Sequence, residues 1–151
     1  LIGQVNPAQV LTMNILFLCV GNSARSQIAE GLAREMLPSN FIVESAGSSP
    51  AGYIHEEALI SMKEIGIDIS NQRSKSFEDL HDDFKNNIDF VITLCAEEIC
   101  PIIKNNAKRI HWPNPDPAVQ NMSSKQKKIL FRETRENIFI MLKKFFTDLD
   151  T

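Results

Sequence analysis

The sequence predicts an α/β fold with three layers, in which a four-stranded parallel sheet is covered by helices on both faces. Short apolar runs alternate with amphipathic segments along the chain. The apolar runs are continuous, as expected for strands that are buried on both faces. Strands that alternate with helices imply right-handed crossover connections, and such connections make neighbouring strands parallel.

The first half of the chain predicts two strands and two helices. The strands are the apolar runs at residues 14–19 and 41–45. The helix between them ends at Pro38, and its apolar stripe comprises Ile28, Ala29, Leu32, Ala33 and Met36. The second helix is closed by Gly66, where a left-handed residue is favoured, and it is lined by Ala58, Leu59, Met62 and Ile65.

The second half predicts two more strands and one long helix. The strands lie at residues 89–95 and 108–112, and the amphipathic helix begins near Ser123 or Ser124. Its expected apolar face comprises Phe131, Thr134, Ile138, Leu142, Phe145 and Leu149. We expect its charged face to be solvated, including residues 125–128, Arg132 and Arg135.

Length and composition limit the class of protein. The 151 residues suit a single domain over residues 13–151, and we expect residues 1–12 to be a flexible N-terminal extension. The net charge of −3 argues against a surface that binds nucleic acid or an anionic membrane. No apolar run approaches the roughly 20 residues that span a bilayer, and no cationic segment typical of a secretory signal is visible. Three cysteines are too few for a disulfide scaffold and favour the reducing cytoplasm.

The segment after the first strand predicts a binding site for a tetrahedral oxyanion. Gly21 and Asn22 tolerate positive φ, so the backbone can curl with its N–H groups pointing inward. The following helix adds the free N–H donors of its N-terminus, and the planar guanidinium of Arg25 fits two anion oxygens. The predicted oxyanion-binding residues are Val20, Gly21, Asn22, Ser23, Ala24, Arg25 and Ser26.

Cys19 immediately precedes this segment and is the candidate nucleophile. A thiol in such a positive field ionises more easily than a free thiol, and Ser26 can donate a hydrogen bond to the sulfur. The alternative is a small buried residue that ends a strand, which is the role of most lone cysteines. The combination of Cys19, Arg25 and Ser26 at these spacings favours the nucleophile.

Cys95 and Cys100 are two further candidate thiols, five residues apart. In a regular helix this spacing puts the Cα atoms roughly 8 to 9 Å apart, beyond the limit of about 7 Å for a disulfide. The pair can therefore bond only if the segment is a loop or unwinds. Two unrelated core cysteines are the alternative, and a zinc site with His111 is disfavoured because we find no convincing fourth ligand.

The segment FLCVGNSARSQIAEG resembles the signature of the low-molecular-weight tyrosine phosphatase fold, C-x-x-x-x-x-R-[ST]. It is most similar to the arsenate reductases of that fold, which read C-x-G-N-S-x-R-S-Q-x-A-E-G, whereas the phosphatases usually carry Pro where this chain has Gln27. The resemblance continues through ESAG (44–47), GIDISNQRSK (66–75), VITLC (91–95), HWPNPDPA (111–118) and FRETRENI (131–138).

The resemblance implies that the protein reduces arsenate to arsenite by a relay of three thiols. In such a relay Cys19 attacks arsenate, Cys95 attacks Cys19 as arsenite leaves, and Cys100 then forms a Cys95–Cys100 disulfide. The resemblance also implies thioredoxin as the reductant and Asp116, followed by Pro117, as the general acid. A turn-forming Asp between two prolines is the alternative role for Asp116.

Two other functions stay open. A low-molecular-weight tyrosine phosphatase would need only Cys19, Arg25 and Asp116, but Ala118 and Val119 stand where such phosphatases usually carry aromatic residues. A non-catalytic oxyanion-binding module would need only Arg25 and the amides of the loop.

Other polar residues have supporting or structural roles in this interpretation. Some arsenate reductases carry an Asp at the position of Lys75 that helps to hold potassium. Because Lys75 supplies positive charge itself, we expect no potassium requirement; a solvated loop lysine is the alternative role. We also expect no metal site and no cofactor. Glu30 either supports the loop or pairs with Arg34 on an exposed face. We expect a monomer without nucleic-acid or membrane partners, and no catalytic role for His55, His81 and His111.

Overall fold

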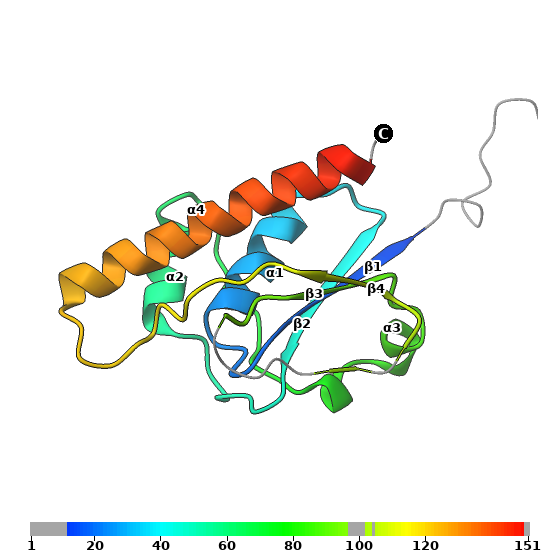
Figure 1. Cartoon of the computed structure of the whole chain (residues 1–151), viewed down its shortest axis with the longest axis horizontal. Coiled ribbons are helices and arrows are strands. Elements are labelled where there is room, and N and C mark those ends of the chain that lie inside the picture. Colours follow the sequence, from blue (N-terminus) through cyan, green and yellow to red (C-terminus); the bar gives the residue numbers. More distant parts are fainter. Residues whose placement is uncertain (1–11, 97–101, 104, 150–151) are drawn as a thin grey trace, which may run out of the picture.

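Four parallel strands form a single sheet. The computed structural model describes residues 12–96, 102–103 and 105–149, so residues 1–11 of the expected extension lie outside the described part. The strand order is β2-β1-β3-β4 (Figure 1). The strands are β1 (Met13–Cys19), β2 (Phe41–Gly47), β3 (Phe90–Thr93) and β4 (Lys108–His111). The predicted four-stranded parallel sheet is confirmed.

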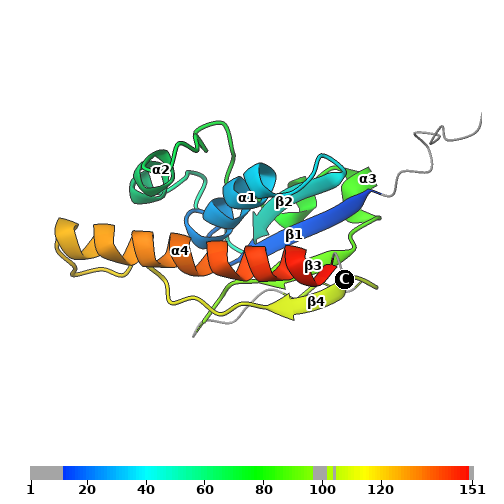
Figure 2. The same cartoon turned by 90° about the horizontal axis from the view of Figure 1, so that it is seen from above.

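Helices cover both faces of the sheet, as predicted. The long helix α4 (Ser124–Leu149) packs beside α1 (Arg25–Met36) on one face, and α2 (Glu56–Lys63) packs against both of them (Figure 2). The other face is covered by α3 (Asp82–Lys85) and the 3-10 helix η2 (Phe77–Asp79). Among the described helices, none has the combined length and apolar character that a membrane crossing requires.

Residues 15–18 of the central strand β1 are apolar because both faces of the strand are buried there. Ile15 and Phe17 point into the larger core, which is shared with α1 and α4. Leu16 and Leu18 point into the smaller core, which is shared with α3. All four side chains are at most 1% exposed. Successive side chains of a strand alternate between its faces, so a strand segment with two buried cores reads as a continuous apolar run.

Two strands end two residues away from their predicted ends. β2 continues to Gly47 because it pairs with β1 along its whole length, up to the Cys19–Gly47 pair. β3 ends at Thr93 rather than at residue 95, because its parallel partner β4 pairs with only four of its residues. Cys95 therefore lies just beyond the strand rather than at its end.

The end of α2 follows the predicted glycine but places a different residue in the core. Gly66 adopts a φ of 81°, its N–H donates to the carbonyl of Lys63, and the N–H of Ile67 donates to the carbonyl of Met62. These two bonds make a Schellman motif. Ile65, which we expected on the apolar face, is 44% exposed, whereas Ile67 packs against the larger core. The motif reverses the direction of the chain, so Ile67 packs against the core in place of Ile65.

The short helices η2 and α3 have no apolar periodicity and were not predicted from the sequence. Polar side chains define where they begin. Ser76 and Asp79 form a reciprocal capping box at η2, and His81 accepts a hydrogen bond from the N–H of Asp83 at the start of α3. Leu80 and Phe84 then cover the smaller core.

An ionic contact joins α2 to α4. Arg132 and Arg135 both donate hydrogen bonds to the carboxylate of Glu64, and Lys128 pairs with Glu57 at 3.0 Å. A hydrogen bond from Arg132 is the largest effect on the pKa of Glu64. Burial opposes it, but with the further hydrogen bond from Arg135 the pKa falls from 4.5 to about 2. The expectation that this face of α4 is solvated is wrong for Arg135, which is buried because α2 packs over it.

Gly47, the last residue of β2, lies against the segment that follows β1. A Cβ atom at this position would stand 2.4 Å from the carbonyl oxygen of Val20 and 3.0 Å from the backbone nitrogen of Asn22. Only glycine therefore allows β2 to approach the segment so closely. The sheet and the segment after β1 are held in one fixed arrangement.

The α2–α4 ionic contact predicts a pH-dependent stability. The pKa of Glu64 is lower in the folded chain than its ordinary value, so its contribution is present above about pH 5 and is lost as the pH falls toward 2. We expect Glu64→Gln to lower the Tm by about 2 °C at pH 7. The difference from the wild type should shrink below about pH 4.5. Thermal unfolding followed by circular dichroism at several pH values measures both effects.

The control for this experiment is Glu133→Gln, at an exposed position of α4. It should leave the Tm nearly unchanged. An equal loss of Tm in both variants, or a difference that does not depend on pH, would contradict the role of Glu64.

The close approach of Gly47 predicts an unequal response of two glycines. We expect Gly47→Ala to destabilise the protein by roughly 1 to 3 kcal/mol, because a backbone carbonyl must move away from the new methyl group. Gly21→Ala is the matched control, since its Cβ would meet only Ser23 Oγ at an ordinary 3.5 Å. Urea unfolding of both variants measures the difference. If the two glycines tolerate alanine equally well, the tight approach is not required.

Candidate active site

The candidate nucleophile lies at the carboxyl end of the central strand. Cys19 is the last residue of β1, is 2% exposed and is a free thiol. Residues 20–26, which we call the oxyanion loop, lead from it into α1, which begins at Arg25. Ala24 provides no side-chain hydrogen bond to cap this helix. The N–H groups at the start of α1 are therefore not capped by the side chain of residue 24, and N–H groups at a helix N-terminus can bind an anion.

The oxyanion loop and Asp116 surround a small pocket. Its volume is about 280 Å³, and its lining comprises Cys19, Val20, Gly21, Asn22, Ser23, Ala24, Arg25, Asp116 and Ala118. The predicted nucleophile, loop and general acid therefore meet at one place. Ser26 is the predicted oxyanion-binding residue that is not part of this lining; it is fully buried beneath the sulfur. Cys95 is not part of this lining either.

Ser26 can donate its hydroxyl hydrogen to the sulfur. Its oxygen lies 2.8 Å from Cys19 Sγ and accepts a hydrogen bond from Asn22 Nδ2 at 2.7 Å. The amide can only donate in this contact and a thiolate can only accept, so with Cys19 ionised the hydroxyl hydrogen is donated to the sulfur. A hydrogen bond of this kind favours the thiolate form of a cysteine, which is the nucleophilic form. The predicted donation from Ser26 has the required geometry.

Asn22 sets the shape of the oxyanion loop. It has a φ of 47°, in the left-handed region, whereas Gly21 does not use its freedom to adopt positive φ. Its side-chain Oδ1 accepts from the backbone N–H of Lys75 at 2.9 Å and from Gln27 Nε2 at 3.0 Å. Its Nδ2 also donates to Ser45 Oγ. One side chain therefore connects the loop to the first turn of α1, to the end of β2 and to the segment that carries Lys75.

Arg25 connects the pocket to two other loops. Its side chain is 5% exposed, and its Nη1 donates to the carbonyls of Asn114 at 3.0 Å and Leu94 at 3.5 Å. Leu94 directly precedes Cys95, and Asn114 lies two residues before Asp116. The guanidinium thus lies where it can bind an anion in the pocket and also where it holds both neighbouring segments.

Asp116 lies exposed at the rim of the pocket, and its Oδ1 accepts from the N–H of Ala118 at 2.9 Å. The turn-forming role and the place at the rim are therefore both present. His55 belongs to the same region. Burial and the nearby Lys127 lower its pKa, partly offset by Glu57 and Asp116.

The histidines have the structural positions that the sequence suggested. His55 Nδ1 accepts from the N–H of Glu57 and caps α2, while the His55 ring packs on Phe131 with centroids 4.7 Å apart. His81 caps α3 in the same way. His111 Nδ1 lies 2.6 Å from Thr93 Oγ1. His55 also donates its backbone N–H to the carbonyl of Ser23, which connects α2 to the oxyanion loop.

Cys95 is 1% exposed and takes part in a disulfide bond, whereas Cys19 does not. The structure thus has no Cys19–Cys95 bond. Cys100 lies outside the described residues.

Glu30 and Lys75 form a buried pair behind the loop. Glu30 is 2% exposed and accepts a hydrogen bond from Ser45 Oγ at 2.6 Å. Lys75 Nζ lies 3.7 Å from Glu30 and 3.7 Å from Glu44, and Arg34 lies 3.1 Å from Glu30. Burial raises the pKa of Glu30, an effect that Lys75 opposes. Both alternatives for Glu30 therefore hold in part: it pairs with Arg34 and it supports the loop, but it does so on a buried face.

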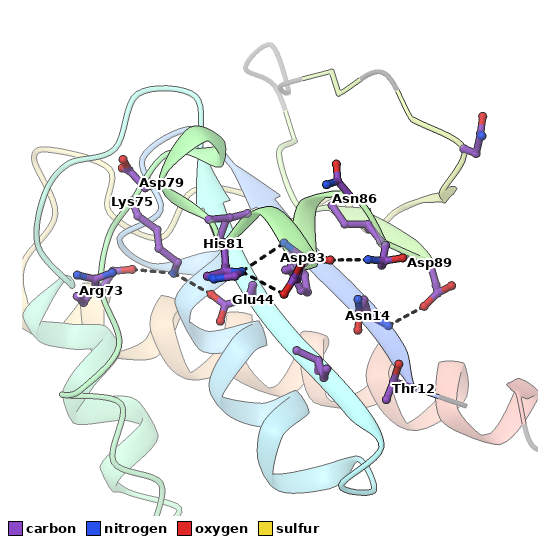
Figure 3. A pocket seen from close by; sticks show the side chains of 16 residues that line it. Thr12, Asn14, Glu44, Arg73, Lys75, Asp79, His81, Asp83, Asn86 and Asp89 are labelled. Carbon is purple, nitrogen blue, oxygen red and sulfur yellow. Dashed lines mark hydrogen bonds and ion pairs between the residues drawn. The ribbon is translucent and has the colours of Figure 1, made fainter. Parts of the chain in front are cut away.

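A larger cavity of about 1040 Å³ lies on the far side of this pair (Figure 3). Figure 3 shows Lys75 reaching toward Glu44 and toward the carbonyl of Arg73 at one end of the cavity. Asn14 and Asp89 lie at the other end, where the Asp89 carboxylate accepts the backbone N–H of Asn14. Among the described residues that line this cavity there is no cysteine, and Cys19 lines only the smaller pocket.

Sequence reasoning missed two polar contributors to the site. Ser45 connects Asn22 to Glu30, and Gln72 donates to Gln27 Oε1 at 2.8 Å. Ser45 stands in the ESAG segment, and Gln72 stands in the GIDISNQRSK segment, both of which carry the family resemblance. The motifs pointed to these segments but not to the individual side chains.

Comparisons with known proteins agree with this geometry. Residues 14–151 match the low molecular weight phosphotyrosine protein phosphatase family. An arsenate reductase of Bacillus subtilis (strain 168) is 43% identical over 133 residues, which cover 87% of this chain and 93% of that protein. A solved arsenate reductase in the phosphate binding state is 28% identical, with a TM-score of 0.72 over 91% of this chain and 98% of that one.

A second solved structure is a thioredoxin-dependent arsenate reductase of Corynebacterium glutamicum. It is 28% identical, with a TM-score of 0.70, and the similarity covers 94% of this chain and 64% of that one. The family match spans every strand and helix of the described fold. The chain therefore belongs to the low molecular weight phosphotyrosine protein phosphatase family, and over most of its length it is similar to arsenate reductases.

Proposed function

We propose that this protein is an enzyme that reduces arsenate to arsenite. The observation that carries the proposal is the free Cys19, 2.8 Å from the hydroxyl of Ser26, in a pocket lined by residues 20–25 and Asp116. Such a pocket fits a tetrahedral oxyanion. The similarity to arsenate reductases over 87% of the chain supports arsenate as that oxyanion.

In the first step the Cys19 thiolate attacks the arsenic atom. An oxygen of arsenate leaves as water, for which Asp116 at the pocket rim is positioned to supply a proton. Arg25 and the loop N–H groups bind the remaining oxygens. This step forms a sulfur–arsenic bond, and the arsenic stays pentavalent.

In the second step the Cys95 thiolate attacks Cys19, and a Cys19–Cys95 disulfide forms. The electron pair of the sulfur–arsenic bond stays with arsenic, which leaves as trivalent arsenite. Cys100 then attacks Cys95, so a Cys95–Cys100 disulfide forms and Cys19 is released as a thiolate. A disulfide at Cys95 beside a free Cys19 is the state that this last step would leave, and it supports the relay.

Thioredoxin is the proposed reductant of the final disulfide. The similarity to an arsenate reductase of Corynebacterium glutamicum that depends on thioredoxin supports this choice. A thioredoxin-coupled relay needs reduced thiols, and we therefore propose that the protein works in the cytoplasm. We also propose that it acts as a monomer.

A coupled assay tests the relay. Arsenate, thioredoxin, thioredoxin reductase and NADPH are combined, and the loss of NADPH is followed for the wild type, Cys95→Ser and Cys100→Ser. We expect both variants to lose turnover by about a hundredfold or more, because each removes a thiol that the cycle needs. Hydrolysis of p-nitrophenyl phosphate is the control, since it needs only the Cys19 pocket and should persist in both variants.

Three results would contradict the proposal. Brisk hydrolysis of p-nitrophenyl phosphate, with no NADPH consumed on adding arsenate, would identify a phosphatase. Phosphate binding without turnover of either substrate would identify an oxyanion-binding module. Full arsenate turnover in Cys95→Ser or Cys100→Ser would rule out the three-thiol relay.

The position of Lys75 predicts that potassium has no effect. Its ammonium group already lies between Glu30 and Glu44, so the buried carboxylate of Glu30 has a cation that belongs to the chain. We expect equal arsenate turnover in KCl and NaCl at the same ionic strength, with choline chloride as the control. A several-fold activation by potassium alone would show that Lys75 does not serve as this cation.

A further inference from the structure

A continuous line of side-chain hydrogen bonds leads from a half-buried glutamine to the nucleophile. It runs through Gln72, Gln27, Asn22 and Ser26 to Cys19. Its four links are Gln72 Nε2 to Gln27 Oε1 at 2.8 Å, Gln27 Nε2 to Asn22 Oδ1 at 3.0 Å, Asn22 Nδ2 to Ser26 Oγ at 2.7 Å and Ser26 Oγ to Cys19 Sγ at 2.8 Å. The middle residues, Gln27, Asn22 and Ser26, are all fully buried.

The amide donors in this line all point toward the sulfur. Gln72 donates to Gln27, and Gln27 and Asn22 each accept with the oxygen on the side of Gln72 and donate with the N–H on the side of Cys19. An amide whose oxygen accepts a hydrogen bond becomes a stronger donor at its nitrogen, so links in one direction reinforce each other. The hydroxyl of Ser26 is the last member, and with Cys19 ionised its hydrogen is donated to the sulfur.

Backbone groups prevent these amides from turning round. Gln72 Nε2 also contacts the carbonyl of Gln27 at 3.0 Å, and Gln27 Nε2 also contacts the carbonyls of Asn22 and Arg73, at 3.1 and 2.8 Å. Carbonyls can only accept, so both nitrogens must stay where they are. The backbone N–H of Lys75 can only donate, and it fixes Asn22 Oδ1. The direction of the line is therefore set by the fold.

We propose that Gln27 and Gln72 are positioning residues that favour the thiolate form of Cys19 through this directed line of hydrogen bonds. The proposal rests on Cys19 being the nucleophile of the proposed reaction. Neither glutamine lines the pocket, so both would act on Cys19 indirectly, through Asn22 and Ser26. Their effect should consequently be visible in the ionisation of the sulfur.

The test measures the ionisation of Cys19 in the reduced full-length chain. Alkylation by iodoacetamide is followed as a function of pH, and peptide mass spectrometry separates Cys19 from the other cysteines. The pH midpoint of Cys19 alkylation is expected to rise by about 0.3 unit in Gln72→Leu and by about 0.5 unit in Gln27→Met, because the remaining donors weaken. A rise of 0.3 unit corresponds to a roughly twofold slower alkylation below the midpoint.

Gln72→Glu removes the first link and places a negative charge beside Gln27 Oε1, because a carboxylate at this position cannot donate to Gln27. We expect its midpoint to rise by about 1 unit. The control is Asn71→Glu, which adds the same charge at the neighbouring exposed position, outside the line. If both variants shift the midpoint equally, charge alone explains the effect and the proposal is wrong.

A double variant tests whether the effect passes through Ser26. In a Ser26→Ala background the last link is absent, so adding Gln72→Leu should cause no further change of the midpoint. A shift of the same size in both backgrounds would overturn the proposal. So would an unchanged midpoint in Gln72→Leu, once circular dichroism shows that the variant is folded. Gln72 is only half-buried, so this variant avoids the packing defect that Gln27→Met can cause.

The alkylation measurement involves no arsenate and no thioredoxin. A protein that shows the predicted midpoints but does not reduce arsenate would contradict only the proposed function. A protein that reduces arsenate with unchanged midpoints would contradict only the role of the two glutamines.

Discussion

The side chain of Asn22 is the contact on which the shape of the site depends. Its amide is bound on both sides, by the backbone of Lys75 and by Gln27 on one side and by Ser26 and Ser45 on the other. These contacts hold a non-glycine residue at a φ of 47°, a conformation that costs free energy by itself. The surrounding fold therefore maintains the curl of the loop before any anion arrives, and a prepared site of this kind binds charge without reorganising.

Much of the fold and the centre of the site could be predicted because their causes are local. The apolar run of β1, the glycine that ends α2 and the stripe of α1 each depend on nearby residues. Cys19 and Arg25 could be assigned to one site because they belong to one short segment. Asp116, which is distant in sequence, could be assigned to that site only through the family resemblance.

The parts that could not be predicted depend on which surfaces meet. The burial of Arg135 follows from α2 packing over α4, and the exposure of Ile65 follows from the reversal at Gly66. The link from Gln72 to Gln27 joins residues 45 positions apart through side chains alone. Buried amide and serine side chains form no periodic pattern in a sequence. Each needs only a hydrogen-bond partner, and that partner can lie anywhere along the chain.

Arg25 connects the pocket to two neighbouring segments of the chain. One nitrogen of this guanidinium supports the carbonyls of Leu94 and Asn114, which belong to the segments that carry Cys95 and Asp116. An arriving oxyanion draws on the charge and the hydrogens of the same group. Binding of an anion in the pocket and the positions of the segments that carry Cys95 and Asp116 therefore depend on the same side chain.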